Sequence, residues 1–379
     1  YIMRTVYFDN AATTPLRPEV VDVMEASLRN DFGNPSSTHG FGRTAKSVIE
    51  TARKDIANVL NASPSEIVFT SGGTEADNLI LQSAVQNLGI QRIISSKIEH
   101  HAVLHTLEHL ANAFNTDIVY VNVLPCGSID LEDLQMHLAA SKVPTLVSLM
   151  HINNEVGNIL PLKEVAEMCK THNVLFHSDT VQSVGHLPIN FSETPLHFAT
   201  AAAHKFHGPK GVGFAYFKKG FGIKPILHGG DQEKGARSST ENVHSILGME
   251  KALLLATESL EEDKGRMNAL KTYFMEGLLQ LDERVRFNGH SSNLEESSCT
   301  IMNVLLPISN DMMLFSLDLQ GIAVSGGSAC QSGSNAGSHV LHEILSEKDE
   351  ELTSIRFSFS RNTTQEELDY TLDKLKGLL

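Results

Sequence analysis

The chain has 379 residues, of which 41% are hydrophobic and 20% are charged, and this composition excludes wholesale disorder. With 30 lysines and arginines against 45 aspartates and glutamates, the formal net charge is −15, which argues against a general binder of nucleic acid. The sequence contains no run of about 18 uncharged apolar residues, so we expect no membrane span. Its four cysteines are widely spaced and form no Cys-x-x-Cys pair, and the N-terminus lacks the apolar stretch of a signal peptide. We therefore expect a cytoplasmic protein with neither a disulfide framework nor a zinc ribbon.

Short apolar runs alternate with helical patterns through the first part of the chain. The runs are rich in Val, Ile and Phe and are bounded by turn residues, as buried strands are. Predicted strands cover 67–70, 92–96, 117–121, 145–151, 174–178, 198–202 and 212–217, and predicted helices cover 75–86, 101–113 and 162–171. This alternation predicts an α/β fold in which a seven-stranded, mostly parallel sheet is flanked by helices. Ligands of such sheets bind outside the carboxyl ends of the strands.

Beyond residue 230 the pattern changes. Two long helices are predicted at 242–258 and 263–281, followed by separated strands at 285–288, 299–305 and 354–358. A last helix is predicted at 365–378, where Thr364 and Glu367 have the spacing of a capping box. This part of the chain predicts a smaller α+β lobe with a boundary near residue 250.

A glycine-rich turn follows the first predicted strand, in the segment Ser-Gly-Gly-Thr-Glu at 71–75. Free N–H groups at the start of a helix suit a phosphate, and the Thr74 hydroxyl would add a donor. The alternative is a tight strand–helix turn with Thr74 as its N-cap. No Walker A or Gly-x-Gly-x-x-Gly motif stands here, so a small phosphate ester fits better than a nucleotide.

Two later strands end in residues that can carry chemistry. Asp179 follows the strand at 174–178, where an acid can hold a protonated ring nitrogen or a metal, or simply cap a helix. Lys205 follows the strand at 198–202 and stands between two histidines. Burial would depress the pKa of its amine and favour Schiff-base chemistry, whereas an exposed loop lysine is the alternative.

Histidines gather after the second strand, beginning with His100. His101, His105 and His109 fall on one face of the predicted helix. That spacing could bind zinc, but the Glu of a His-Glu-x-x-His site is missing, so we expect no metal site.

Cys330 lies in a Gly- and Ser-rich segment at 325–334, which predicts an exposed mobile loop carrying a reactive thiol. The other cysteines, Cys126, Cys169 and Cys299, stand in or beside apolar elements, and we expect them to be structural. Arg356 lies within an apolar strand and needs an anion, either a substrate carboxylate or an internal Asp or Glu.

Taken in order, these segments resemble the cysteine desulfurases, which are fold-type-I pyridoxal-phosphate enzymes of the class-V aminotransferase group. The resemblance covers residues 7–377. It rests on Tyr-Phe-Asp-Asn-Ala-Ala-Thr-Thr-Pro at 7–15, Ser-Gly-Gly-Thr-Glu at 71–75, His-Ile-Asn-Asn-Glu at 151–155, His-Ser-Asp-Thr-Val-Gln at 177–182 and His-Lys at 204–205. Ser-Ala-Cys at 328–330 resembles the NifS/IscS branch of the family rather than the SufS branch.

The resemblance implies a catalytic role for Lys205, Cys330 and His100. Lys205 would form the Schiff base with pyridoxal 5'-phosphate, and His100 would stack on the cofactor ring and move protons. Cys330 would receive the sulfur. Asp179 would pair with the pyridinium nitrogen, which keeps the ring an electron sink. Arg356 would bind the substrate carboxylate.

The resemblance also implies a larger set of cofactor contacts. The expected cofactor-binding residues are Gly73, Thr74, Asn154, Asp179, Gln182, His204, Lys205 and Thr240. Asn154 would also contact the substrate, and Arg237 and Thr240 would reach the phosphate across a dimer interface. One departure is Ala202, which stands where the family usually has a phosphate-binding serine. The loss of one hydrogen bond, about 1–2 kcal/mol, affects cofactor affinity rather than cofactor identity.

We therefore expect a homodimeric L-cysteine desulfurase that releases alanine and leaves a persulfide on Cys330. The sulfur would pass to an acceptor protein, such as an iron–sulfur scaffold or a component of tRNA or cofactor thiolation, without binding to nucleic acid or membrane. The expected domains are a large cofactor-binding domain at 15–250 and a small domain made of 1–14 and 251–379. The alternatives are a selenocysteine lyase, another class-V enzyme such as an aminotransferase, or a non-catalytic adaptor of a sulfur pathway. Cys330 argues against an aminotransferase, and the complete catalytic set argues against an adaptor.

Overall fold

The central sheet of the protein has seven strands in the order β2-β8-β7-β6-β5-β3-β4. A computed structural model describes residues 4–326 and 337–379. The strands are β2 (Ile67–Thr70), β3 (Arg92–Ser95), β4 (Asp117–Tyr120), β5 (Thr145–Ser148), β6 (Leu175–Asp179), β7 (Phe198–Ala202) and β8 (Gly213–Phe217). β8 runs antiparallel to its neighbours β2 and β7, and the remaining pairs are parallel. This confirms the predicted mostly parallel α/β sheet.

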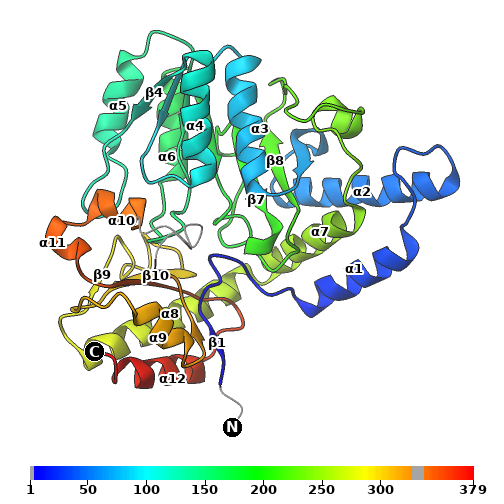
Figure 1. Cartoon of the computed structure of the whole chain (residues 1–379). Helices are drawn as coiled ribbons and strands as arrows, with labels where there is room; N and C mark the ends of the chain where they lie inside the picture. The colour runs from blue at the N-terminus through cyan, green and yellow to red at the C-terminus, as the bar shows by residue number, and fades with distance from the viewer. Residues whose placement is uncertain (1–3, 327–336) are drawn as a thin grey trace.

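Helices cover both faces of this sheet (Figure 1). One face packs against α3 (Gly73–Gln86) and α4 (His101–Phe114). The other face packs against α1 (Pro18–Asn30), α2 (Gly40–Val59), α5 (Leu131–Ala140), α6 (Leu162–Thr171) and α7 (Val243–Glu258). Within β2, Val68 packs on the face covered by α3 and α4, and Ile67 and Phe69 pack on the opposite face. Successive side chains of a strand point to opposite faces, so a strand buried on both faces is apolar at every position.

The C-terminal elements build a second, smaller core, drawn at the bottom of Figure 1. Its three-stranded sheet has the order β12-β10-β9, from β9 (Arg286–Phe287), β10 (Ile301–Leu305) and β12 (Ser354–Ser358). Around it lie α8 (Leu260–Leu281), α9 (Met313–Asp318), α10 (His339–Ile344), α11 (Glu347–Glu350) and α12 (Gln365–Leu375). The N-terminus joins this core, because β1 (Val6–Tyr7) pairs with β11 (Ile322–Ala323) and Phe8 packs on Phe274 and Phe359. The predicted domain boundary stays a prediction, and residue 250 itself lies inside α7.

Several predicted element ends differ from the structure. The strand predicted at 145–151 ends at Ser148, and the backbone of 149–151 continues as an irregular segment whose Leu149 and His151 N–H groups donate to carbonyls of β6. The last helix ends at Leu375 rather than at 378, while its predicted capping box is confirmed, with Thr364 as the N-cap. α3 begins at Gly73, two residues earlier than predicted. Within the described ranges, no helix is both long and apolar enough to cross a membrane.

Candidate active site

A cavity of about 390 Å³ lies at the carboxyl ends of the central strands, where ligands of α/β sheets bind. It falls within the range of roughly 300–1,000 Å³ that is usual for small-molecule sites. The fold brings most of the predicted site residues to its wall: Gly73, Thr74, His100, Asn154, Asp179, Gln182, His204, Lys205 and Arg356. Thr240 is exposed and does not line this cavity, and Cys330 lies outside the described residues.

Lys205 is held by a short turn directly after β7. It ends the 3-10 turn Ala203–Lys205, and its backbone carbonyl accepts a hydrogen bond of 2.8 Å from Nε2 of His186. Its Nζ donates to the carbonyls of Ala11 at 2.6 Å and Ala12 at 2.9 Å. The N-terminal segment therefore fixes the amine at the cavity wall, although Ala11 and Ala12 lie 194 and 193 residues away from Lys205 along the chain.

Asp179 is the last residue of β6 and is 5% exposed. Its Oδ1 accepts hydrogen bonds from the backbone N–H of Val181 at 2.9 Å and from Oγ1 of Thr200 at 3.3 Å. No residue in the described part of the chain donates to Oδ2. A carboxylate with one oxygen fixed by the protein and the other available can accept a hydrogen bond from a protonated ring nitrogen in the cavity.

The start of α3 forms the other end of the cavity and fits a phosphate. Among described residues, nothing accepts hydrogen bonds from the N–H groups of Gly73, Thr74 and Glu75, which are the donors that a helix N-terminus offers to an anion. Gly72 has a φ of 152°, in the region that favours glycine. A Cβ on Gly73 would lie 2.7 Å from Cγ2 of Val181, so only glycine lets the helix start this close to β6.

His204 adds a polar group to the phosphate end. Its Nδ1 lies 3.2 Å from Oγ1 of Thr13, and burial together with nearby Lys205 and Lys210 lowers the pKa of its imidazole to about 4. A neutral ring can still donate one N–H to a phosphate oxygen. Ala202 lines the cavity at this end and supplies no hydroxyl, as the sequence indicated.

His100 stands at the N-cap of α4, with its Nδ1 accepting the backbone N–H of Ala102 at 3.1 Å. Nδ1 therefore carries no proton, and in the neutral ring the proton sits on Nε2. Burial lowers the pKa of His100, the charge of Asp179 opposes that shift, and Lys205 adds to it. The ring is thus mostly neutral at neutral pH, and its Nε2–H is the donor that it can offer to a group in the cavity.

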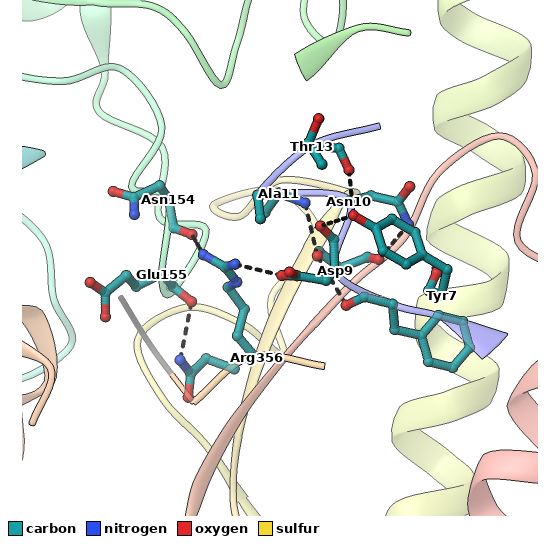
Figure 2. Close-up of polar contacts among 12 residues, drawn as sticks. Tyr7, Asp9, Asn10, Ala11, Thr13, Asn154, Glu155 and Arg356 are labelled. Carbon is teal, nitrogen blue, oxygen red and sulfur yellow. Dashed lines mark hydrogen bonds and ion pairs between the residues drawn. The ribbon is translucent and has the colours of Figure 1, made fainter. Parts of the chain in front are cut away.

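Arg356 is 2% exposed, and its guanidinium forms the internal ion pair that was one of the two arrangements the sequence left open. Nη2 forms an ion pair of 2.8 Å with Oδ1 of Asp9, and Nη1 donates to the carbonyl of Asn154 at 2.8 Å, as Figure 2 shows. Nevertheless the side chain lines the cavity. The internal ion pair is therefore present, and the role of Arg356 toward a substrate carboxylate stays a prediction.

The remaining sequence candidates lie elsewhere. Arg237 is ion-paired with Glu75 at 2.7 Å, so within one chain it supports the start of α3 rather than pointing a bare charge at the cavity. The histidine stripe does not gather ligands: His101 stacks on His105, and no group of three potential ligands that could hold a metal occurs among the described residues.

Sequence analysis missed two titratable cavity residues that tertiary packing brings in. Asp77 lies on α3 behind the glycine-rich turn, and His339 enters from α10. It also gave no role to Asp9, which does not line the cavity but forms the ion pair with Arg356. An acid inside the apolar face of α3 was a readable signal for Asp77, because a buried carboxyl needs a partner. Nothing in the sequence marked His339, whose helix, α10, packs on Ile98 and Val156.

Donors for a phosphate, an acid for a ring nitrogen and a fixed amine thus line one cavity, and this donor set fits pyridoxal 5'-phosphate. The family model for class-V aminotransferases matches residues 6–371. The cysteine desulfurase IscS of Dictyoglomus turgidum is 42% identical over 378 residues, which cover 99% of this chain and 95% of the relative.

Solved structures agree with this match. A NifS-like protein superposes with a TM-score of 0.91 at 37% identity, covering 99% of both chains. SspA, solved in complex with cysteine, superposes with a TM-score of 0.80 at 30% identity, covering 95% of this chain and 100% of that one. Fold and cavity therefore define a pyridoxal-phosphate-dependent enzyme of fold type I. The chain belongs to the NifS/IscS-like cysteine desulfurases of the class-V aminotransferase family.

Proposed function

We propose that this protein converts L-cysteine to L-alanine and takes the sulfur onto Cys330 as a persulfide. The observation that supports it most is that Lys205, Asp179 and Arg356, from three separate elements, line one cavity. Sulfur transfer makes one bond and breaks one. A new S–S bond forms to the Cys330 thiolate, the bond between the substrate sulfur and its β-carbon breaks, and the electron pair stays on that carbon. The carbon then takes up the proton that the substrate thiol gives up.

Bound pyridoxal phosphate supplies an electrophilic aldehyde and a ring that accepts electrons from the substrate Cα. The residues of the chain do the rest. Gly73, Thr74 and His204 hold the phosphate, Asp179 holds the proton of the ring nitrogen, and Lys205 provides the amine that reacts with the aldehyde. Asn154 and Gln182 complete the wall beside the ring, and Gln182 is fixed by its 2.9 Å hydrogen bond to the carbonyl of Ala11.

The position of Cys330 as the sulfur acceptor is supported by the described residues on either side of segment 327–336. Before it, Ser325 and Arg356 exchange backbone hydrogen bonds of 3.2 and 2.7 Å. After it, His339 lines the cavity and Ser338 donates to the buried carboxylate of Glu155. The described residues that flank the segment on both sides therefore contact residues that line the cavity.

Arg356 is proposed to bind the substrate carboxylate, so Arg356→Lys should raise the KM for cysteine about tenfold or more, because lysine cannot form the bidentate pair. The dissociation constant of pyridoxal phosphate should change less than about twofold. Steady-state kinetics and cofactor titration measure the two quantities. Arg286→Lys is the matched control, since Arg286 lies in β9 of the same three-stranded sheet and forms an ion pair with Asp349 of α11. Equal losses of substrate and cofactor affinity would instead assign Arg356 a structural role.

His100 should set the acid limb of the pH profile. Its pKa is lowered, so the neutral ring, with Nδ1 on the Ala102 N–H and the proton on Nε2, is lost only as the pH falls through a value below the usual 6.5. We expect kcat/KM to decline with acidification below that value, and His100→Gln to lower kcat roughly 10²–10⁴-fold and to remove this limb. His105→Gln, one turn further along α4 and exposed, is the control. An unchanged acid limb in His100→Gln would assign the titration to another group.

The proposal extends to the assembly and the pathway. A homodimer is supported by exposed apolar side chains at the join of α1 and α2, where Phe32 is 67% and Phe41 is 61% exposed. In such a dimer Thr240 would reach the partner's phosphate site. The names of the IscS relatives support an acceptor protein such as an iron–sulfur scaffold. A reactive thiol among unpaired cysteines supports a reducing compartment, the cytoplasm.

The experiment that tests the proposal is the quantification of products from L-cysteine in the presence of a thiol reductant. Alanine and sulfide should form in equal amounts. Pyruvate and ammonia as main products, or activity confined to selenocysteine, would overturn it.

A further inference from the structure

A second buried carboxyl lies directly behind Asp179. Asp77, on the first turns of α3, is 1% exposed and borders the cavity. Its Oδ1 has no hydrogen-bond partner among the described residues. Nε2 of His177 is likewise without a partner and lies 3.4 Å from that oxygen, and His177 is fully buried. Burying two neighbouring polar atoms without hydrogen bonds raises the free energy of the folded state, unless the two atoms share a proton.

Thr200 connects this carboxyl to Asp179. Thr200 of β7 pairs in register with Asp179 of β6, and its hydroxyl contacts both Oδ1 of Asp179 and the carboxyl of Asp77. A hydroxyl has one proton, so Thr200 can donate a hydrogen bond to only one of the two carboxyls. Toward the other carboxyl its oxygen either accepts a hydrogen bond, if that carboxyl is protonated, or repels a carboxylate oxygen.

The charges around this group allow one ionised carboxylate. Burial raises the pKa of Asp77 well above its usual range, and the charge of Asp179 raises it further. Burial also raises the pKa of Glu99, a third carboxyl near Asp179, to about 8. His177 offers no compensating charge, because burial lowers its pKa to about 3. Like charges this close do not both ionise in a site without water.

One arrangement of protons satisfies every group. Oγ of Ser148 lies 2.9 Å from Nδ1 of His177 and donates to it, which places the imidazole proton on Nε2, facing Oδ1 of Asp77. A neutral Asp77 then donates to Thr200, and Thr200 donates to Asp179. Each hydrogen bond in this chain points toward Asp179.

We propose that Asp77 is a positioning residue that, in its neutral form, directs the Thr200 hydroxyl at Asp179 and so keeps the single negative charge of this cluster on Asp179. The inference rests on the proposed role of Asp179 toward the cofactor ring. Donated hydrogen bonds lower the proton affinity of a carboxylate. The proton shared between Asp179 and the ring nitrogen consequently stays on the ring.

The test uses the full-length protein loaded with pyridoxal phosphate labelled with ¹⁵N in the ring. The ¹⁵N chemical shift reports whether the ring nitrogen is protonated, and the dissociation constant of the cofactor is measured beside it. Asp77→Ala should move the shift toward the unprotonated value and weaken cofactor binding about tenfold, the effect of one hydrogen bond to a charged group. Asp77→Asn should leave both within about twofold of wild type, because an amide can donate to Thr200 and accept from His177.

Thr200→Val breaks the connection and should reproduce the effect of Asp77→Ala. Adding Asp77→Ala to Thr200→Val should have no further effect, because Asp77 acts through Thr200. Asp133→Ala removes a buried aspartate of α5 that does not line the cavity, and should change neither quantity. Should Asp77→Ala fail to fold, the comparison of Asp77→Asn, which keeps the hydrogen bond to Thr200, with Thr200→Val, which removes it, tests the inference.

Two results would overturn the inference. One is an Asp77→Asn variant that shifts the ¹⁵N signal as strongly as Thr200→Val, which would make Asp77 an anion. The other is Thr200→Val with an unchanged signal. Asp179→Asn separates this failure from that of the proposed function: if it moves the ¹⁵N signal while Thr200→Val does not, only the role of Asp77 is lost. If Asp179→Asn also leaves the signal unchanged, the assignment of Asp179 itself is wrong.

Discussion

Lys205→Ala should abolish desulfurase activity, with a fall in turnover of roughly a thousandfold or more, because the protein loses the amine that reacts with the cofactor aldehyde. Structurally, the amine is fixed by the carbonyls of Ala11 and Ala12, and no other amine is held in this way at the cavity wall of the described structure. Borohydride reduction of the wild-type holoenzyme, followed by peptide mass spectrometry, should place the cofactor on Lys205. The variant should give no labelled peptide.

Lys210→Ala is the matched control for this experiment. Lys210 stands five residues further on in the same segment and is exposed, so its loss should leave both the label and the turnover unchanged. Labelling of Lys210, or of any lysine other than Lys205, would refute the assignment.

Cys330→Ser should stop the release of alanine and sulfide, again by about a thousandfold or more, while cofactor binding is retained. A serine hydroxyl is not a thiolate and cannot take up the sulfur. After incubation of the wild-type enzyme with cysteine, mass spectrometry should find one added sulfur atom on Cys330.

The other cysteines serve as controls with a physical basis. Burial raises the pKa of the Cys169 thiol to about 12 and that of Cys299 to about 11, so neither is a thiolate at neutral pH. Cys126 is partly exposed, so among the described cysteines it is the one whose thiol is most accessible. Cys126→Ser should keep full turnover. Desulfurase turnover in Cys330→Ser would contradict the mechanism and favour a lyase or aminotransferase.

Much of the fold was predictable because the central strands are buried on both faces. Such strands are continuous apolar runs, and those at 67–70 and 198–202 were predicted with the ends that the structure has. Six α-helices of the described residues were not predicted, namely α1, α2, α5, α9, α10 and α11. Pro18 at the first helical position of α1 was a usable signal, but the exposed apolar side chains of this region obscure a one-sided pattern.

The sequence by itself determined where the proposed site residues stand relative to the strand ends. Lys205 and Asp179 follow apolar strands, and Gly72 and Gly73 precede a helix, so each was readable from its immediate neighbours. These properties are local, because strand burial, glycine conformation and helix starts depend on residues close along the chain.

Only the tertiary structure decided which of these groups meet. Asp9 and Arg356 form an ion pair across 347 residues, and no local pattern records that the N-terminal segment crosses to β12. The same holds for Asp77 and Asp179, which become neighbours because α3 packs on one face of the sheet and strand register sets Thr200 beside Asp179. Register and helix packing decide the distance between charges, and burial then decides their protonation, so the electrostatics of this site depend on the folded chain.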